Sequence, residues 1–549
     1  MNAPFDALPL VVGLTGHRDP PDAAEAPLRK RFGEILDGLR QRHPTLRPFV
    51  LSGLAAGADI FAAEEAIERG VAVLGCLPMP QAEYERDFAP EELERFRRVL
   101  LRCSDVVVVG TSDRRQQNYV DVANFIAYYS HVLVAFWDGL PARGPGGTAQ
   151  VVDLRQHGSP SVAADALVTY MPDVGPVIQI VTPRKDQPPP AQPFTVHETY
   201  PQRPGWKTGA KRAAQDAGEQ EFEDALDHLA RFDQDLAAVP ASKAADRLRA
   251  LGDRTDSAAN RLQARTLRSL QSVYIATALA GAAQLVLPTD GSFHIPTWAG
   301  IAARIAFLAV ALAVFAVAKR NDFENRYQDY RAIAEALRVQ SAWNAAGMRL
   351  RFVESAYLQM QQSELEWIRL ALRTAYLVCA VAGPARDDGA PAPAQAVGWV
   401  ESQVEYYEAA GKREKRRLER AHLAMLLLVI AGGALSAGAS AFAWMLSNGW
   451  LPSSSAASDP VLTYWATMPF ALGSMLALLI RFYVQQRGYG ENARRYQHMF
   501  TVFDAARRRL RERPDDPRAV LEQLGREALT EHAEWLILHR DRPLTFVHT

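Results

Sequence analysis

Four apolar segments, each about 20 residues long, constrain the fold of this chain more than any other feature. They cover residues 267–287, 298–318, 422–446 and 461–480. A helix of about 20 residues spans the hydrocarbon core of a bilayer, and these segments form two pairs with a short turn inside each pair. Four buried helices of a large soluble core are the alternative. Paired segments of this length favour two transmembrane hairpins, so we expect a protein with four transmembrane helices and the lipid bilayer as its partner.

Basic residues lie at only one end of each predicted hairpin. The turns at 288–297 and 447–460 contain no Lys or Arg, whereas the outer ends of the segments are rich in them. Because positive charge is retained on the cytoplasmic side of a membrane, both termini are expected in the cytoplasm. The flanking basic residues are Arg261, Arg265, Arg268, Lys319, Arg320 and Arg481, together with the run KREKRRLER at 412–420.

Two residues inside the predicted spans depart from a plain apolar helix. Arg304 lies in the second span, where a charge exposed to hydrocarbon would cost about 2.5–3.5 kcal/mol or more. Its side chain either reaches back to the near interface or faces a polar interior or pore. Pro469 lies in the fourth span, and it is expected to kink that helix and leave a backbone carbonyl without its usual partner.

The segments that follow the two hairpins repeat a short set of residues. Arg326-Tyr327-Gln328 follows the second span and Arg495-Tyr496-Gln497 follows the fourth, and each is followed by an acid and an arginine at matched spacing. A Glu-Trp pair comes later in both, at 366–367 and 534–535. Matches in the same order indicate duplication of a unit made of one hairpin and the helices after it. These helices are expected to continue the membrane helices.

Stretches rich in proline and alanine divide the chain further. Its length of 549 residues exceeds what one hydrophobic core normally holds, so several units are expected. The predicted organisation is an α/β domain at 1–184, a linker at 185–213, a first repeat at 214–381, a second linker at 382–396 and a second repeat at 397–549.

Charge and cysteine content exclude two kinds of partner. The net charge of −1 provides no general basic surface, so a nucleic-acid partner is not expected. The cysteines at 76, 103 and 379 are scattered and lack the spacing of metal ligands, so no metal site is expected.

The first 184 residues alternate between short β-rich runs and amphipathic helical stretches. This alternation is typical of a parallel sheet with helices on both faces, a Rossmann-like α/β fold. Ligands of such sheets bind beyond the carboxyl ends of the strands, where loops meet helix N-termini. The predicted strands are 10–16, 49–53, 71–77, 105–110, 132–139 and 177–181.

Three glycine-containing loops follow predicted strands and are expected to share this edge of the sheet. Glycine lets the backbone approach a ligand closely, free amides at a helix start attract anions, and an arginine adds positive charge. Together the loops predict a phosphate-bearing ligand. The candidate ligand-binding residues are Gly13, Thr15, Gly16, His17 and Arg18 in the first loop, Ser52, Gly53, Leu54, Ala55, Gly57 and Asp59 in the second, and Gly146, Gly147 and Thr148 in the third.

Several polar residues at this edge allow more than one role. His17 suits a catalytic base, although a hydrogen-bonded loop histidine is the commoner case. Asp59 follows the second loop, and an aspartate there more often caps a helix or holds a loop than does chemistry. Tyr119 follows the fourth predicted strand and either closes over a ligand or is simply solvated.

The second and third loops resemble those of the SLOG superfamily, which includes the DNA-processing protein DprA, the LOG phosphoribohydrolases and the N-terminal region of TRPM channels. The run from Ser52 to Asp59, SGLAAGAD, is similar to the SGLAxGID run of DprA proteins, and Gly146-Gly147-Thr148 resembles the distal loop. This resemblance covers residues 8–184. The duplicated unit at 215–549 resembles SLATT, a two-helix membrane effector module that often accompanies SLOG domains in bacterial conflict systems.

The resemblance implies a sensor and an effector in one chain of the bacterial inner membrane. SLOG domains of this setting bind nucleotides or nucleotide-derived signals, so an ADP-ribose-like compound or a cyclic nucleotide is expected as ligand. SLATT modules perforate or depolarise the membrane. Four helices are too few to enclose a wide pore, so a homo-oligomer is expected.

One departure from the family bears on catalysis. LOG enzymes carry an acid three positions after the Thr of their PGGxGTxxE motif, but Thr148 is followed here by Ala149-Gln150-Val151. Glycosidic hydrolysis needs a placed carboxylate, so binding without turnover is favoured, with Asp59 as the carboxylate that would substitute.

The leading hypothesis is a ligand-gated pore that acts in stress or anti-phage defence. The alternative is a membrane-anchored nucleotide glycosidase or phosphoribohydrolase. A DprA-like DNA-binding protein lacks its basic groove, and a passive scaffold leaves the three loops unexplained.

Overall fold

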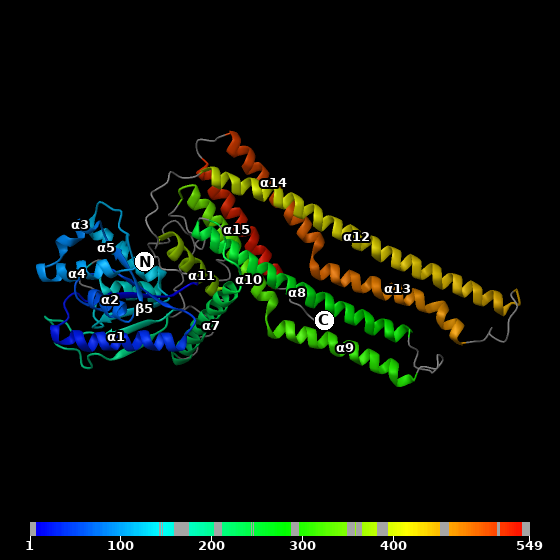
Figure 1. Cartoon of the computed structure of the whole chain (residues 1–549), viewed down its shortest axis with the longest axis horizontal. Helices are drawn as coiled ribbons and strands as arrows, with labels where there is room; N and C mark the ends of the chain where they lie inside the picture. The colour runs from blue at the N-terminus through cyan, green and yellow to red at the C-terminus, as the bar shows by residue number, and fades with distance from the viewer. Residues whose placement is uncertain are drawn as a thin grey trace. The chain divides into compact units, whose positions relative to one another are not determined.

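The chain, seen here as a computed structural model, forms two compact units, each built from two separate stretches of sequence (Figure 1). The first comprises Met1–Thr255 and Leu358–Gly389, and the second comprises Asp256–Tyr357 and Ala390–Thr549. Both predicted hairpin turns and both predicted linkers lie partly outside the described residues. The structure describes residues 7–540 except 142–143, 145, 159–174, 202–210, 243, 245, 287–295, 349–356, 358–364, 382–392, 451–459 and 513–516.

A seven-stranded, mostly parallel sheet forms the centre of the first unit. Its order is β4-β3-β2-β1-β5-β6-β7, and β7 runs antiparallel to β6. The predicted α/β fold and its six predicted strands are confirmed. The additional strand β7 lies in the predicted linker, where four mostly exposed residues carry no apolar alternation that marks a strand. The strands are β1 (Leu10–Gly16), β2 (Pro48–Ser52), β3 (Ala72–Leu77), β4 (Asp105–Val108), β5 (Val132–Trp137), β6 (Val177–Val181) and β7 (Val196–Thr199).

Helices pack on this sheet in two groups. The helices α1, α2 and α4 are neighbours, and α5 packs with α6, as expected for the faces of a sheet whose strand order reverses beside β1. The ring of Phe136 on β5 packs against Phe32 and Phe61, with centroid distances of 5.9 and 5.4 Å. The helices of this unit are α1 (Asp22–Arg42), α2 (Ala58–Glu68), α3 (Gln81–Tyr84), α4 (Pro90–Arg102), α5 (Arg115–Tyr129), α6 (Thr148–His157), α7 (Lys211–Ala237) and α11 (Glu366–Tyr376).

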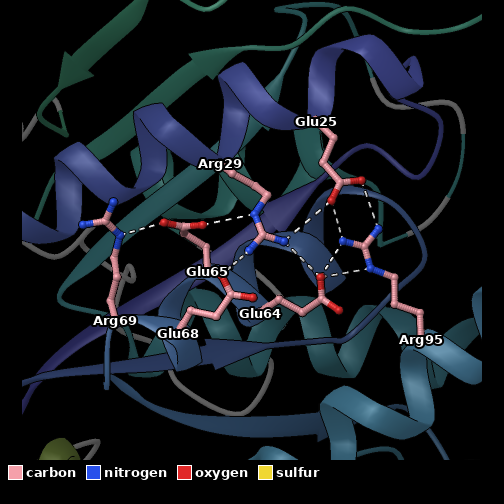
Figure 2. Close-up of polar contacts among 7 residues, drawn as sticks. All are labelled: Glu25, Arg29, Glu64, Glu65, Glu68, Arg69 and Arg95. Atoms are coloured by element: carbon pink, nitrogen blue, oxygen red, sulfur yellow. Dashed lines mark hydrogen bonds and ion pairs between the residues drawn. The ribbon is translucent and has the colours of Figure 1, made fainter.

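An ion-pair network ties α1, α2 and α4 together (Figure 2). Arg29 on α1 donates to three carboxylates of α2, those of Glu64, Glu65 and Glu68, at 3.1, 3.1 and 2.6 Å. Arg95 on α4 bridges Glu64 and a carboxylate of α1. Each arginine donates several charge-assisted bonds in a fixed fork, so the network holds α2, whose first turn lies at the predicted ligand edge, in one position.

Replacing Arg29 by methionine is expected to loosen α2, because Glu64, Glu65 and Glu68 then lose the one cation that they share. A loss of about 1–2 kcal/mol in local stability is expected, and it should shrink at high salt. Faster amide hydrogen exchange in α2 would report it. Arg31→Met is the matched control, because Arg31 is 48% exposed and pairs with no acid but Glu34 among the described residues, whereas Arg29 is 19% exposed. Equal exchange in the two variants would contradict the role of the network.

The last part of the first predicted repeat packs in the first unit. Trp367 on α11 stacks on His228 of α7 with ring centroids 5.6 Å apart. Thr374 Oγ1 lies 2.8 Å from Nε2 of His131, next to β5. Arg373 donates to the carbonyl of Tyr128 at 3.0 Å, at the end of α5. A stretch that lies between the second and third predicted spans is therefore docked on the sheet domain.

Four helices long and apolar enough to cross a membrane confirm the four predicted spans as helices. Many of their large apolar side chains are exposed, and a soluble protein seldom exposes an apolar surface of this extent. The first of these helices begins in the first unit and continues into the second. The helices are α8 (Arg247–Val286), α9 (Thr297–Arg320), α12 (Pro393–Ser447) and α13 (Pro460–Arg487).

The helices α12 and α13 lie side by side (Figure 1) and approach closely at two glycines. A Cβ atom on Gly432 would lie 2.6 Å from the carbonyl oxygen of Pro469, and one on Gly473 would lie 2.5 Å from that of Leu428. Small residues let membrane helices pack at this distance. The helix α13 continues through Pro469, and the next amide, that of Phe470, donates to Ser436 Oγ at 3.0 Å. This bond between helices satisfies a backbone group next to the proline.

Arg304 has a polar partner within its own hairpin. Its guanidinium donates to the side-chain oxygen of Gln284, on α8. A hydrogen bond between two helices reduces the cost of a charged group near the hydrocarbon region.

The sequence predicted that the helices after each hairpin continue the membrane helices. In the structure, one residue or a short turn separates them from the membrane helices. Asp322, with φ of 51°, separates α9 from α10, and Gly488, with φ of 59°, separates α13 from α14. A residue in the left-handed region interrupts the helical path, because an α-helix requires a negative φ at every position. These outer helices are α10 (Phe323–Ala345), α14 (Tyr489–Glu512) and α15 (Arg518–Arg540).

The duplicated motif forms matching contacts in α10 and α14. Glu335 pairs with Arg338 three residues later, and Asp504 pairs with Arg507 at the same spacing. The hydroxyl of Tyr327 accepts a hydrogen bond from Gln263 Nε2 at 3.0 Å. The repeated residues thus serve contacts between and within helices, which is what duplication of a structural unit requires.

Candidate functional site

The three predicted loops lie where the strand order reverses. The first strand, β1, pairs with β2 on one side and with β5 on the other, so the loops after these three strands leave the same edge of the sheet. The amide of His17 donates to the carbonyl of Phe136 at 3.1 Å, and the amide of Ala58 donates to the carbonyl of His17 at 3.0 Å. In doubly wound sheets this reversal point is where ligands bind.

Two predicted glycines bring the first two loops together. Gly57 has a φ of 83°, and a Cβ there would lie 2.6 Å from the carbonyl oxygens of His17 and Arg18. A Cβ on Gly16 would lie 2.4 Å from the side chain of Ala58. Packing between the loops therefore accounts for these two glycines. Gly13 lies farther back, within β1, where it packs against Ser130 and the end of α5.

His17 is buried and holds the loop after β5. Its Nε2 accepts a hydrogen bond from the backbone amide of Asp138 at 3.1 Å, and one carboxylate oxygen of Asp138 lies at the same distance. Burial lowers the pKa of His17 and outweighs the opposing effect of the Asp138 carboxylate. A neutral ring that accepts from an amide acts as a structural link between loops.

Asp59 is a buried carboxyl in the first turn of α2. It is 8% exposed, and burial raises its pKa to about 7, although Arg18 and the amides of Ala55 and Gly16 favour the charged form. Its Oδ1 accepts no hydrogen bond from the described residues. Ser52 holds the loop before it, donating to the carbonyl of Asp59 at 3.2 Å. A buried carboxyl with a pKa near neutrality is typical of functional sites.

Arg18 and two tyrosines flank this carboxyl. The guanidinium of Arg18 is exposed and lies over the ring of Tyr119, 5.2 Å from its centroid. The hydroxyl of Tyr84 donates to the carbonyl of Gly53 at 3.1 Å. Burial raises the pKa of Tyr84, Arg18 opposes this increase and Asp59 adds to it, so the three side chains are close enough to interact electrostatically. Arg18 forms no ion pair with the described acids.

The third loop contacts the same tyrosine, Tyr119. Gly146 has a φ of 74°, and a Cβ there would lie 3.0 Å from the carbonyl oxygen of Tyr119. Its amide donates to the side-chain oxygen of Gln150 at 2.8 Å. Gly147 precedes the first residue of α6, Thr148, which is buried. The N-terminus of α6 therefore lies beside α5 at the position that holds Arg18.

The structure thus groups most of the predicted residues around Asp59, Arg18 and Tyr119, and leaves Gly13 outside. Tyr84 belongs to this group but was missed, because it lies on a four-residue helix between β3 and α4 that has no motif of its own. Among the described residues, no group of three or more His, Cys, Asp or Glu side chains is arranged to hold a metal ion.

Comparison with known proteins adds one finding on the membrane region. A family model described as "Protein of unknown function (DUF4231)" matches residues 254–343. This range covers most of α8, all of α9 and most of α10. No match was found among the curated proteins compared with this sequence. Neither SLOG nor SLATT is among the matching family models.

Proposed function

We propose that this chain is a nucleotide-signal receptor of the bacterial inner membrane, in which the α/β domain controls a pore formed by the membrane helices of several copies. The proposal extends the resemblance to SLOG sensors and SLATT effectors. One observation carries it: three loops converge at the reversal point of the sheet around Arg18, whose guanidinium is exposed and without an ion pair among the described residues.

The chemistry of this edge suits a phosphate group. An arginine binds phosphate through parallel charge-assisted hydrogen bonds, and the N-terminus of α6 beside it contributes a partial positive charge. Tyr119 holds the guanidinium by its ring and therefore reduces the entropy lost when an anion binds. The proposal has both termini in the cytoplasm, the side on which the basic residues flanking the spans would be retained.

A route for coupling runs along α5. This helix lies beside the ligand edge at Tyr119, and at its other end Tyr128 accepts a hydrogen bond from Arg373 of α11. The sequence of α11 lies between the second and third membrane helices. A ligand that binds one position of α5 more tightly than another would therefore shift the equilibrium between the corresponding positions of α11. The size of the shift is set by the difference between the two affinities.

Flux measurements on the reconstituted full chain test this function. Liposomes that contain the protein and a self-quenched dye should leak when a ligand is present on the side of the α/β domain. The probes are the ribonucleoside mono- and diphosphates, ADP-ribose and cyclic nucleotides. Arg18→Gln should raise the half-maximal concentration by about tenfold or more, because a charge-assisted bond is lost. Arg31→Gln, on the same unit, should not. Absence of leakage with every probe would contradict the proposal.

The buried carboxyl supports a second candidate, a membrane-anchored nucleotide glycosidase or phosphoribohydrolase. A pKa of about 7 for Asp59 suits a group that exchanges protons near neutral pH. Release of free base from nucleoside monophosphates, lost in Asp59→Asn, would favour this enzyme. Binding of the same compounds without base release would exclude it.

A further inference from the structure

Asp59 has hydrogen-bonding capacity that the protein does not use. The residue is more than nine-tenths buried, its Oδ2 lies 3.4 Å from where a Cβ of Gly53 would stand, and its Oδ1 accepts no hydrogen bond from the described residues. A buried carboxyl oxygen without a donor is costly, and in native proteins such a group usually has a partner in the functional state. The position therefore calls for a donor from outside the chain.

We propose that this donor is a ribose hydroxyl, so that the ligand is a ribonucleotide and Asp59 distinguishes it from a deoxyribonucleotide. This inference rests on the proposed nucleotide-binding function and adds the chemical class of the ligand. The phosphate pairs with Arg18, and a hydroxyl of the adjoining sugar donates to Asp59.

The charges around Asp59 select a neutral donor. A second phosphate group next to this carboxyl would meet a like charge, and a cation would need more ligands than the described His, Cys, Asp and Glu residues offer as a group. A hydroxyl donates one hydrogen bond without adding charge. It is therefore the group that satisfies Oδ1 while the neighbouring arginine holds an anion.

The position in the sheet agrees with this assignment. Asp59 lies in the first turn of α2, which follows β2 after the loop at 53–57, and β2 pairs with β1, whose loop carries Arg18. In doubly wound sheets an acidic side chain beyond the neighbouring strand binds the ribose of a nucleotide whose phosphate lies at the reversal point. The sugar and its phosphate are a few bonds apart, which matches two side chains that interact electrostatically.

Paired ligands test the assignment in the full-length protein. Calorimetry would compare each ribonucleoside 5′-monophosphate with its 2′-deoxy and 3′-deoxy forms. At least one deoxy form should bind the natural protein roughly 10–100-fold more weakly, the effect of one hydrogen bond to a charged group. In Asp59→Ala the ribonucleotide should lose that advantage, so that the ratio falls to near one while the affinity for the deoxynucleotide is retained. Retained binding also establishes that the variant is folded.

Asp233→Asn is the matched control, because Asp233 is a second buried aspartate of the same unit whose pKa is raised to about 7 by burial. Asp233 lies on α7 and accepts a hydrogen bond at 2.9 Å from the amide of Leu8, just before β1, so this variant should leave the ratio unchanged. Equal affinity for ribo- and deoxynucleotides in the natural protein would overturn the inference and leave the nucleotide-binding function standing. Failure of every nucleotide to bind would overturn both.

Discussion

Gly432→Val is expected to separate the second membrane hairpin and to lower the stability of the membrane region by about 3 kcal/mol. A Cβ at this position would lie 2.6 Å from the carbonyl oxygen of Pro469, a backbone atom that cannot rotate away. The two added methyl groups would push α13 from α12 and break the bond from Phe470 to Ser436. Thermal unfolding of the detergent-solubilised protein, followed by tryptophan fluorescence, would measure the loss.

Gly438→Val is the control. It separates the loss of close packing at Gly432 from any general effect of replacing glycine by valine in a membrane helix. Gly438 lies on the same helix, and its would-be Cβ has no described atom within 4 Å. Both variants replace glycine by the same β-branched residue, so they differ in what the side chain meets. If Gly438→Val lowered the midpoint as much as Gly432→Val, close packing at Gly432 would not stabilise the hairpin.

The features that local sequence determines were predicted well. A span needs about 20 apolar residues wherever it lies, so 267–287 and its three counterparts could be read from hydropathy alone. Buried parallel strands are continuous apolar runs, and this pattern located β1 to β6. The strand β7 was missed because its four mostly exposed residues form a strand only through their pairing with β6. Likewise, no local pattern indicates that α11 packs on the sheet domain.

The candidate site also has a part that local sequence predicts and a part that only the fold determines. Glycine loops after strands could be recognised from the sequence, but Gly16 and Gly57 meet the neighbouring loop, a contact that depends on the order of strands in the sheet. Whether Asp59 caps a helix, holds a loop or awaits a ligand depends on the donors around it, and these come from two loops that are far apart in sequence, those after β1 and β2. Tyr84 enters the site through the fold alone.

Glu335→Gln is expected to destabilise the helices outside the membrane by about 3 kcal/mol. The Glu335 side chain is 17% exposed and pairs with Arg331 at 2.8 Å and with Arg338 at 2.5 Å. Burial disfavours its charge, but Arg338 and Arg331 outweigh burial and lower its pKa to about 2. Because the folded pKa lies below the ordinary 4.5, this stabilisation is full above that pH and is lost as the pH falls through about 2. Chemical unfolding followed by helical circular dichroism would measure it.

Asp504→Asn in the second repeat provides the matched control, since Asp504 holds the same position in the duplicated motif and pairs with Arg507 and Arg508. Arg508 is 64% exposed, so water can replace the lost carboxylate, and a cost below about 1 kcal/mol is expected. In the first repeat Arg331 and Arg338 would remain side by side with fewer waters to solvate them. A similar cost in both variants would mean that enclosure of the pair does not determine its contribution. A larger cost at Glu335 would mean that the two copies of the motif contribute unequally to the free energy of unfolding, although their sequences match.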